Sequence, residues 1–357
     1  MKVAVVLGTR PEIIKMAPVM RELNKQKIDY FIIHTNQHYS KEMDKFIFRD
    51  LELDPAKYNL NVGSGIHGLQ TGKMLGSIEE VYLKERPDIV LVHGDTNTTL
   101  AGALAAKKLN IKVGHVEAGI RSNDSTMPEE VNRVLVDHMT DLYFVPTILA
   151  NNNLIKEGVD SSKIYVVGNT VVDAVLQNAA IAEKKSNILP NLQIKDYILI
   201  TAHRPTNVDS KESLQKIINI LSQLKTVCST VIFPVHPRTK KNIEDFGLKY
   251  PKNTKIIEPI GYLDFLILEK NAKLIITDSG GLQEEACIFK VPCVTLRENT
   301  ERPESVQVGA NILSGIEPKN VINNVKKMIQ KSRDWKNPFG DGTTSKQIVD
   351  ILIGGEK

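Results

Sequence analysis

Short apolar runs alternate with segments of helical periodicity along the whole chain. Most runs are continuously apolar and rich in β-branched residues, which is typical of parallel strands buried on both faces. The helical segments between them, such as 15–24, 76–84, 98–108 and 282–289, supply crossover connections. This alternation predicts an α/β fold with two open parallel sheets, each flanked by helices. The expected strands are 3–7, 31–34, 89–92, 113–116, 142–145, 197–200, 231–235, 255–257, 274–277 and 293–296.

Two domains are expected, because 357 residues are too many for one ordinary core. We place the boundary after Gly168, so that residues 1–168 form the N-terminal domain and 169–342 the C-terminal domain. The stretch 183–192 is largely polar and is interpreted as a surface connection. Segment 345–353 is amphipathic, so its apolar residues require a surface to cover. Ligands of such domains bind at the carboxyl ends of the strands.

The charge and cysteine content narrow the class of protein. Lys+Arg 46 and Asp+Glu 42 leave a net charge of +4, spread too evenly to favour nucleic acid or an anionic membrane as a partner. Apolar runs stay short of the ~20 residues that cross a membrane. The apolar start of the chain leads directly into a polar turn, so it is interpreted as a strand and not as a signal peptide. The 3 cysteines argue against a disulfide scaffold and favour the cytoplasm.

Candidate chemistry begins at the end of the first predicted strand. Gly8 permits a tight turn there, and the helix that follows carries Arg10 and Lys15 near its start. Amides at a helix N-terminus attract anions, and the two cations would add charge-assisted contacts to a phosphate. An ordinary strand–helix turn with two surface cations explains the pattern equally well.

Three carboxylates follow the ends of later strands in the first half. Asp95 follows strand 89–92, Glu117 closes strand 113–116, and Glu129 opens the next helix, which also carries Arg133. The alternatives are structural: Asp95 as a helix cap, Glu117 as a turn cap, and Glu129 as a partner of the helix dipole. His93, just before Asp95, is explained by none of these roles.

The second half repeats the arrangement of polar residues at strand ends. His203 and His236 each follow a strand, where a ligand role and a turn role are about equally expected. The strongest motif is a strand that ends in a turn and opens a helix, and its residues are Ser279, Gly280 and Gly281. Two glycines bring backbone amides close to an anion, and Ser279 adds a hydroxyl, so the motif suits a diphosphate.

Two further residues complete this set. Glu285 lies one turn into the same helix, placed to accept hydrogen bonds from a ribose, and Arg302 is a further cation.

By contrast, the G-x-G-x-x-G match at 63–68 does not sit at a first strand–helix turn, so it is interpreted as a loop. Neither the 8 histidines nor the 3 cysteines have metal-ligand spacing. No cofactor and no metal are therefore expected.

These motifs, in this order, resemble those of the non-hydrolysing UDP-N-acetylglucosamine 2-epimerases over nearly the whole chain. The resemblance implies the GT-B architecture, with two Rossmann-like domains and an active site between them. It also implies a homodimer and a C-terminal helix, 343–357, that returns to the N-terminal domain. The matching motifs are 8–12, 93–96, 115–119, 128–133, 277–285 and 300–304.

The resemblance assigns roles to further residues. It places Lys15 and Arg133 along the cleft, Phe265 near the uracil, and the backbone of Ile260 against it, while Glu285 holds the ribose. The chain departs from the bacterial pattern at 205–207, after His203 and Arg204. It departs again at 36–39 from members regulated by a second substrate molecule, so substrate activation is not implied.

The family reaction is the reversible conversion of UDP-N-acetylglucosamine to UDP-N-acetylmannosamine. Its chemistry needs an acid and a base near C2, because that C–H bond has no adjacent carbonyl, and groups that stabilise a departing diphosphate. The expected catalytic residues are Asp95, Glu117, Glu129 and His203. The expected anion cradle consists of Arg10, His203, Ser279, Gly280 and Arg302.

Three alternatives remain open. The first is a 2-epimerase of a related UDP-diacetamido-uronic acid, the second a GT-B glycosyltransferase, and the third a non-catalytic nucleotide-sugar-binding regulator.

Overall fold

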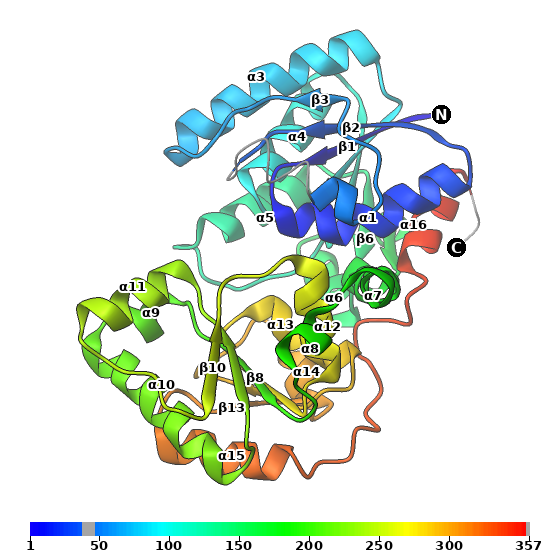
Figure 1. The fold of residues 1–357 in the computed structure, drawn as a ribbon. Coiled ribbons are helices and arrows are strands. Elements are labelled where there is room, and N and C mark those ends of the chain that lie inside the picture. Colours follow the sequence, from blue (N-terminus) through cyan, green and yellow to red (C-terminus); the bar gives the residue numbers. More distant parts are fainter. Residues whose placement is uncertain (38–46, 355–357) are drawn as a thin grey trace. The chain divides into compact units, whose positions relative to one another are not determined.

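The computed structural model describes residues 1–37 and 47–354. In segment 36–39, where the sequence differs from family members regulated by a second substrate molecule, His38 and Tyr39 lie outside the described residues. The chain divides into two compact units, the first comprising Met1–Gln177 and the residues from Phe339 onward, the second Asn178–Pro338 (Figure 1). The first unit extends beyond the expected boundary at residue 168. The two units divide between Gln177 and Asn178, within helix α7 (Thr170–Lys185).

The first unit is built on a seven-stranded parallel sheet in the order β3-β2-β1-β4-β5-β6-β7. All five strands expected in this half are confirmed. Two short strands complete the sheet: β3 (Tyr58–Asn59), which the sequence indicates only weakly, and β7 (Ile164–Val166), which was not predicted. Both lie at the sheet's edges, where a strand needs no continuous apolar run. The confirmed strands are β1 (Lys2–Leu7), β2 (Asp29–His34), β4 (Ile89–His93), β5 (Lys112–Val116) and β6 (Leu142–Val145).

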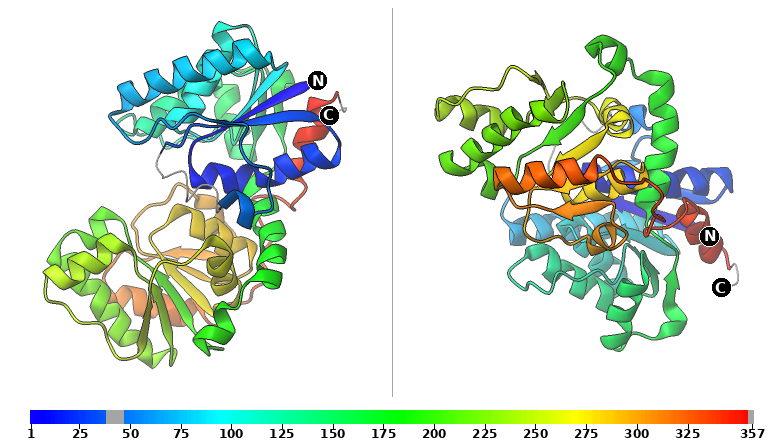
Figure 2. Two further views of the ribbon diagram at one scale, coloured as in Figure 1. Left: turned by 45° about the horizontal axis from the view of Figure 1, so that its top comes forward. Right: turned by 90° about the horizontal axis from the view of Figure 1, so that it is seen from below.

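Helices cover both faces of this sheet (Figure 1). Ala4 and Val6 of β1 pack into a core with α3 and α4. Helix α16 lies beside α1 (Figure 2). Gln26, just after α1, donates a hydrogen bond of 2.9 Å to Asp350 of α16. The amphipathic C-terminal segment therefore covers its apolar face within the first unit. The helices are α1 (Arg10–Lys25), α3 (His67–Glu85), α4 (Asn97–Lys108), α5 (Pro128–His138), α6 (Ile148–Lys156) and α16 (Thr344–Leu352).

Helix α3 begins well before the expected position 76. Its first residues, His67 and Gly68, belong to the G-x-G-x-x-G match, so the interpretation of that whole match as a loop was wrong. Glycines in this segment obscured the helical pattern in the sequence. The buried residues Gln70, Met74 and Ile78 recur at the spacing of one helical face and hold it in place.

The second unit contains a six-stranded parallel sheet in the order β10-β9-β8-β11-β12-β13. The five expected strands are confirmed, and β13 at the edge was not predicted. Side chains alternate between two cores: Ile198 and Ile200 pack on one face, Tyr197 and Leu199 on the other. The strands are β8 (Ile198–Thr201), β9 (Val231–Pro234), β10 (Thr254–Ile257), β11 (Leu274–Thr277), β12 (Cys293–Thr295) and β13 (Asn311–Leu313).

Helices α10 and α15 adjoin one core of the second unit, and α8, α12 and α13 adjoin the other (Figure 1). The expected surface connection at 183–192 is instead the end of α7 followed by α8, because apolar residues such as Leu189 and Leu192 pack on the core. The helices are α8 (Ile188–Leu192), α9 (Pro205–Val208), α10 (Lys211–Gln223), α11 (Pro237–Asp245), α12 (Tyr262–Asn271), α13 (Gly280–Ile288), α14 (Pro303–Gln307) and α15 (Pro318–Met328).

Both sheets have the strand order of a doubly wound fold. In the first, β1 lies between β2 and β4; in the second, β8 lies between β9 and β11. Such folds bind ligands beyond the carboxyl ends of the strands where the order reverses. Arg10, Asp95, His203 and Ser279 follow β1, β4, β8 and β11 in this way.

Gly8 is required where β1 ends. A Cβ atom there would lie 1.9 Å from Oγ1 of Thr98 and 2.6 Å from Oγ1 of Thr35, and these two hydroxyls are themselves hydrogen-bonded at 2.8 Å. Gly8→Ala is expected to destabilise the protein by ~1–3 kcal/mol, the usual cost of overpacking. Gly76→Ala, on the exposed side of α3 with open space around it, is the control and is expected to stabilise by ~0.5–1 kcal/mol. Denaturant unfolding measures both, and a Gly8→Ala protein as stable as wild type would contradict the expectation.

Candidate active site

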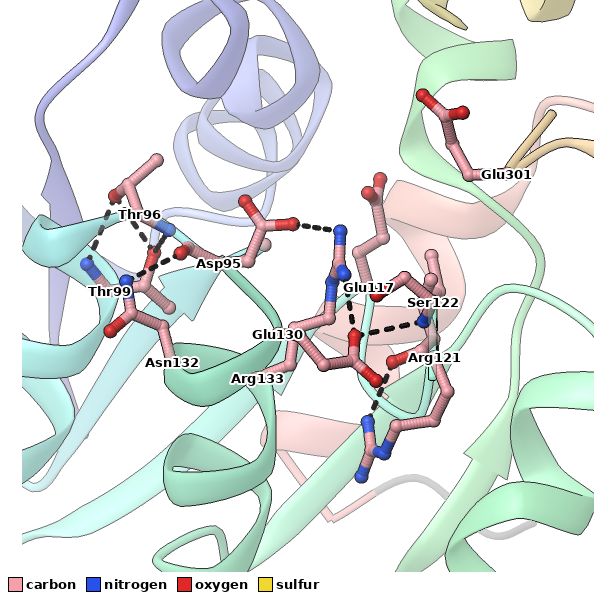
Figure 3. Close-up of polar contacts among 12 residues, drawn as sticks. Asp95, Thr96, Thr99, Glu117, Arg121, Ser122, Glu130, Asn132, Arg133 and Glu301 are labelled. Carbon is pink, nitrogen blue, oxygen red and sulfur yellow. Dashed lines mark hydrogen bonds and ion pairs between the residues drawn. The ribbon is translucent and has the colours of Figure 1, made fainter. Parts of the chain in front are cut away.

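Asp95 is fixed by contacts with helix α5. It lies in the loop after β4, and its carboxylate is 2.5 Å from Nη2 of Arg133, while Asn132 donates a hydrogen bond of 2.9 Å to its carbonyl oxygen (Figure 3). The cap of α4 is Thr96, whose hydroxyl accepts a hydrogen bond from the amide of Thr99. The alternative that Asp95 caps this helix is therefore wrong.

Glu117 lies at the end of the neighbouring strand, in a cluster of buried polar groups. Its carboxylate is 2.6 Å from Nζ of Lys15 and 3.5 Å from Nε2 of His93. Its φ of 71° places it in the left-handed region, which is unfavourable for a residue with a side chain and is often found at functional sites. The buried His93, which no capping role explained, thus faces a carboxylate from the next strand.

Glu129 and Glu130 differ in their surroundings. Glu129 is exposed in the first turn of α5, whereas Glu130 is buried. Glu130 accepts hydrogen bonds from the amides of Ser122 (2.9 Å) and Asn123 (3.0 Å) and pairs with Arg133 at 2.8 Å (Figure 3). Burial alone would raise the pKa of Glu130, but these hydrogen bonds bring it below its ordinary value. Glu130 thus orders the loop before α5 and holds Arg133 toward Asp95.

Glu12 joins the loop after β1 to the loop after β4, and sequence reasoning did not select it. Its buried carboxylate accepts hydrogen bonds from the amides of Gly8 (3.0 Å) and Thr9 (2.7 Å) and from the hydroxyl of Thr96 (2.8 Å). Arg10 directly follows Thr9, is the first residue of α1 and is partly exposed. The sequence signal was the capping box formed by Thr9 and Glu12.

A second buried carboxylate supports the ends of β4 and β5. Asp137 lies 2.7 Å from Nδ1 of His115 and 2.7 Å from Nη1 of Arg121, and the other ring nitrogen of His115 lies 2.8 Å from the carbonyl oxygen of Gly94. Burial would raise the pKa of Asp137, but His115 and Arg121 together hold it below its ordinary value. The network therefore fixes Gly94, directly before Asp95.

In the second unit, Asp278 organises the loop after β8. It is fully buried and accepts hydrogen bonds from the amides of His203 (3.0 Å) and Arg204 (2.9 Å) and from the side chain of Asn207 (3.0 Å). Nδ1 of His203 lies 3.1 Å from its carboxylate, and 44% of the His203 side chain is exposed. The ring of His203 is thus held at one nitrogen and open to solvent.

His236 and the start of α13 lie near the same strand ends. The rings of His203 and His236 are 6.1 Å apart, and burial, followed by the charge of His203, lowers the pKa of His236. Ser279 is the N-cap of α13, with Gly280 and Gly281 as its first residues. A Cβ at Gly280 would lie 2.7 Å from the Glu301 carboxylate, so a side chain there would require the Glu301 side chain to move.

The remaining candidates of the second unit flank α12 and α13. Arg302 pairs with the buried Glu284 of α13 at 2.9 Å. Ile260 and Phe265 are partly buried at the edge of the core under α12, and Glu285 is a partly exposed residue of α13. Across residues 1–37 and 47–354, no group of three His, Cys, Asp or Glu side chains could hold a metal ion.

Comparison with known proteins decides the family. The model of the UDP-N-acetylglucosamine 2-epimerase family matches residues 21–353. The UDP-N-acetylglucosamine 2-epimerase of Methanocaldococcus jannaschii is 58% identical, with 100% of both chains covered. The chain belongs to the UDP-N-acetylglucosamine 2-epimerase family. The UDP-2,3-diacetamido-2,3-dideoxy-D-glucuronate 2-epimerase of Pseudomonas aeruginosa is 39% identical, with 99% of both chains covered.

A solved structure of the epimerase family supports the same conclusion. The crystal structure of the Methanocaldococcus jannaschii enzyme in complex with UDP-GlcNAc and UDP matches with a TM-score of 0.88, covering 99% of this chain and 100% of that one. The expected α/β fold of GT-B type is thereby confirmed.

Within this family fold, the candidate residues form two groups. The first unit holds Asp95 with Arg133 and Glu117 with Lys15, while Arg10 and Glu129 stand at the first turns of α1 and α5. All remaining candidates belong to the second unit. Sequence reasoning did not select the buried carboxylates that position them, which are Glu12, Glu130, Asp137 and Asp278.

Asp278 is expected to make the free energy of unfolding depend on pH in the acidic range. Burial would raise its pKa, but hydrogen bonds and the charge of His203 lower it. A carboxyl whose pKa is depressed by folding stabilises the protein above its unfolded pKa of about 3.9, and this contribution is lost as pH falls through the folded value. Asp278→Asn should therefore reduce the unfolding free energy at pH 6 by ~1.5–3 kcal/mol, the range of hydrogen bonds to a charged group.

The difference between wild type and Asp278→Asn should shrink below pH 4, and urea unfolding at pH 6 and pH 3 measures it. Asp245→Asn, at an exposed position on α11, is the matched control. A difference that stays constant down to pH 3 would contradict the assigned charge state.

Proposed function

We propose that the protein catalyses the reversible C2 epimerisation of UDP-N-acetylglucosamine and UDP-N-acetylmannosamine. The observation that carries the proposal is the pair of carboxylates at adjacent strand ends: Asp95 held by Arg133, and Glu117 held by Lys15 beside His93. Proton transfer at both faces of one carbon needs two such groups. Family membership and the close match to a relative bound to UDP-GlcNAc and UDP support the choice of sugar nucleotide.

The proposed reaction is elimination followed by re-addition. A carboxylate takes the proton from C2, the electron pair of that C–H bond forms the C1–C2 double bond, and the C1–O bond breaks with its electrons on UDP. Addition of UDP to the resulting 2-acetamidoglucal, with a proton delivered to the opposite face of C2, gives the epimer. We assign the acid–base steps to Asp95, Glu117 and Glu129, and His203 assists them.

The second unit is proposed to bind the nucleotide. Amides of Ser279, Gly280 and Gly281 at the start of α13 suit the diphosphate, because the helix N-terminus favours negative charge. Arg10 and Arg302 supply positive charge, and His203 and His236 supply ring nitrogens as hydrogen-bonding groups, where negative charge develops on the leaving group. Glu285 is assigned to the ribose, and Ile260 and Phe265 to the uracil.

Incubation with UDP-N-acetylglucosamine alone tests the function. Proton NMR should show the mannose-configured UDP-sugar accumulating to a fixed ratio without added nicotinamide or metal. Release of free sugar and UDP without the epimer would favour a hydrolytic or transferase reaction. Faster turnover of the UDP-diacetamido-glucuronate would instead favour the reaction named for the Pseudomonas aeruginosa relative.

We further propose a cytoplasmic homodimer. Exposed apolar side chains on α5 and α6, including Val131, Leu135, Ile148 and Leu149, would suit a contact with a second copy. The three cysteines are buried with free thiols, in keeping with a reducing compartment. None of the helices in the described part of the chain is long and apolar enough to cross a membrane. Light scattering that gives the mass of a single chain would contradict the dimer.

A further inference from the structure

His93 carries a buried ring without a hydrogen-bond partner. It is the last residue of β4, and only 4% of its side chain is exposed. Across residues 1–37 and 47–354, neither Nδ1 nor Nε2 of this ring makes a hydrogen bond. Buried polar groups are almost always hydrogen-bonded, because burial removes their bonds to water. An apolar side chain would fill this position without that penalty, so packing does not explain the histidine.

The backbone, and not the ring, fixes the position of His93. Its carbonyl oxygen accepts a hydrogen bond of 2.7 Å from the hydroxyl of Thr99 on α4. In the parallel pairing of β4 with β5, His93 lies opposite Val116. Glu117 directly follows Val116, so the strand register brings Glu117 close to the ring of His93.

The ring faces the carboxylate of Glu117. Nε2 of His93 lies 3.5 Å from Oε2 of Glu117, and Nζ of Lys15 lies 2.6 Å from the same oxygen. A formed hydrogen bond measures about 2.7–3.2 Å, so the His93 contact is slightly too long to be one. Contacts of catalytic groups are often long before substrate binds and shorten in the complex. Closing this gap would make Nε2–H a donor to Glu117.

We propose that His93 is a positioning residue for Glu117: when the sugar nucleotide binds, Nε2–H donates a hydrogen bond to the carboxylate that Lys15 already contacts. The inference rests on the proposed function, which assigns an acid–base step to Glu117. The φ of 71° at Glu117 is a strained conformation, which persists only where surrounding contacts determine it. Donors from α1 and β4 hold the carboxylate in the geometry that proton transfer at C2 requires. Loss of the His93 donor therefore slows the chemical step and leaves nucleotide binding unchanged.

Three substitutions at this position separate the donor from the packing. His93→Gln places an amide N–H near the position of Nε2, His93→Asn places one near that of Nδ1, and His93→Leu fills the space without a donor. For UDP-N-acetylglucosamine, kcat should stay within about fivefold of wild type in His93→Gln and fall by ~10–10² in the other two, the loss expected for one hydrogen bond to a charged group. UDP affinity, measured by calorimetry, should be unchanged in all three. His138→Gln, at an exposed position on α5, is the control and should keep the kcat of wild type.

A spectroscopic measurement tests the contact without turnover. In protein labelled with nitrogen-15 histidine, the ring resonances of His93 are those that are missing from His93→Gln. Glu117→Gln should shift the Nε2 resonance of His93, whereas Glu80→Gln, at an exposed position on α3, should not. An unshifted His93 resonance in Glu117→Gln, or equal kcat in the Gln and Leu variants of His93, would overturn the inference. Wild-type protein that leaves UDP-N-acetylglucosamine unchanged would instead refute the proposed function, whatever the NMR spectra show.

Discussion

Asp95→Asn and Glu117→Gln are each expected to lower turnover by ~10²–10⁴, the range for loss of a general acid or base. Both variants remove a proton-transfer group but keep a similar shape. The nucleotide is assigned to the second unit, so UDP affinity should stay nearly unchanged. Steady-state kinetics with UDP-N-acetylglucosamine, together with UDP titration by calorimetry, measures the two effects separately.

The exposed Glu129 is included in the same experiment, because its role rests on the resemblance and on its place in the first turn of α5. Glu129→Gln is expected to show a loss in the same range, and Glu80→Gln, exposed on α3, serves as the control. If turnover stays near that of wild type in all three variants, these loops are structural and the assignment of the acid–base groups is wrong.

Arg10→Ala is expected to lower mainly kcat, whereas Glu285→Ala is expected to lower mainly the affinity for UDP. Arg10 stands at the positive end of the α1 dipole and is assigned to the departing diphosphate, whose charge increases as the C1–O bond breaks. Its loss should lower kcat by ~10²–10³, as for other groups that stabilise developing charge. UDP affinity should change less, because the groups proposed to hold the nucleotide, the α13 amides and Glu285, remain in place.

Glu285→Ala should instead mainly weaken UDP binding, by about tenfold, since a hydrogen-bond acceptor for the ribose is lost. Arg21→Ala, which removes a cation near the other end of α1, is the matched control for Arg10. Equal losses of UDP affinity for Arg10→Ala and Glu285→Ala would contradict the division of roles.

The sequence predicted the central strands because their burial on two faces leaves continuous apolar runs, as in β4 and β11. It missed the edge strands β7 and β13, which are short and pair on one side only. The first turns of helix α3 were not predicted, because they contain glycines where a helical pattern would have apolar residues.

The sequence predicted the candidate residues of the site but not the buried residues that hold them in position. Residue types such as Asp95 and Glu117 stand out at strand ends, whereas Asp278 accepts hydrogen bonds from the amides of His203 and Arg204, which are far away in the sequence. Such bonds depend on the folded path of the chain and leave no local spacing to detect. Likewise, which of Glu129 and Glu130 points inward depends on the rotation of α5, and packing sets that rotation.

The most direct test of the central claim is the fate of the C2 hydrogen. With UDP-N-acetylglucosamine in deuterated water and no added nicotinamide, elimination through an exchanging carboxylate places solvent deuterium at C2 of the UDP-N-acetylmannosamine formed. Proton NMR should therefore show loss of the C2 proton signal in the product, at a rate that matches epimerisation. Epimerised product that retains its original C2 hydrogen, or turnover that requires added NAD, would contradict the account.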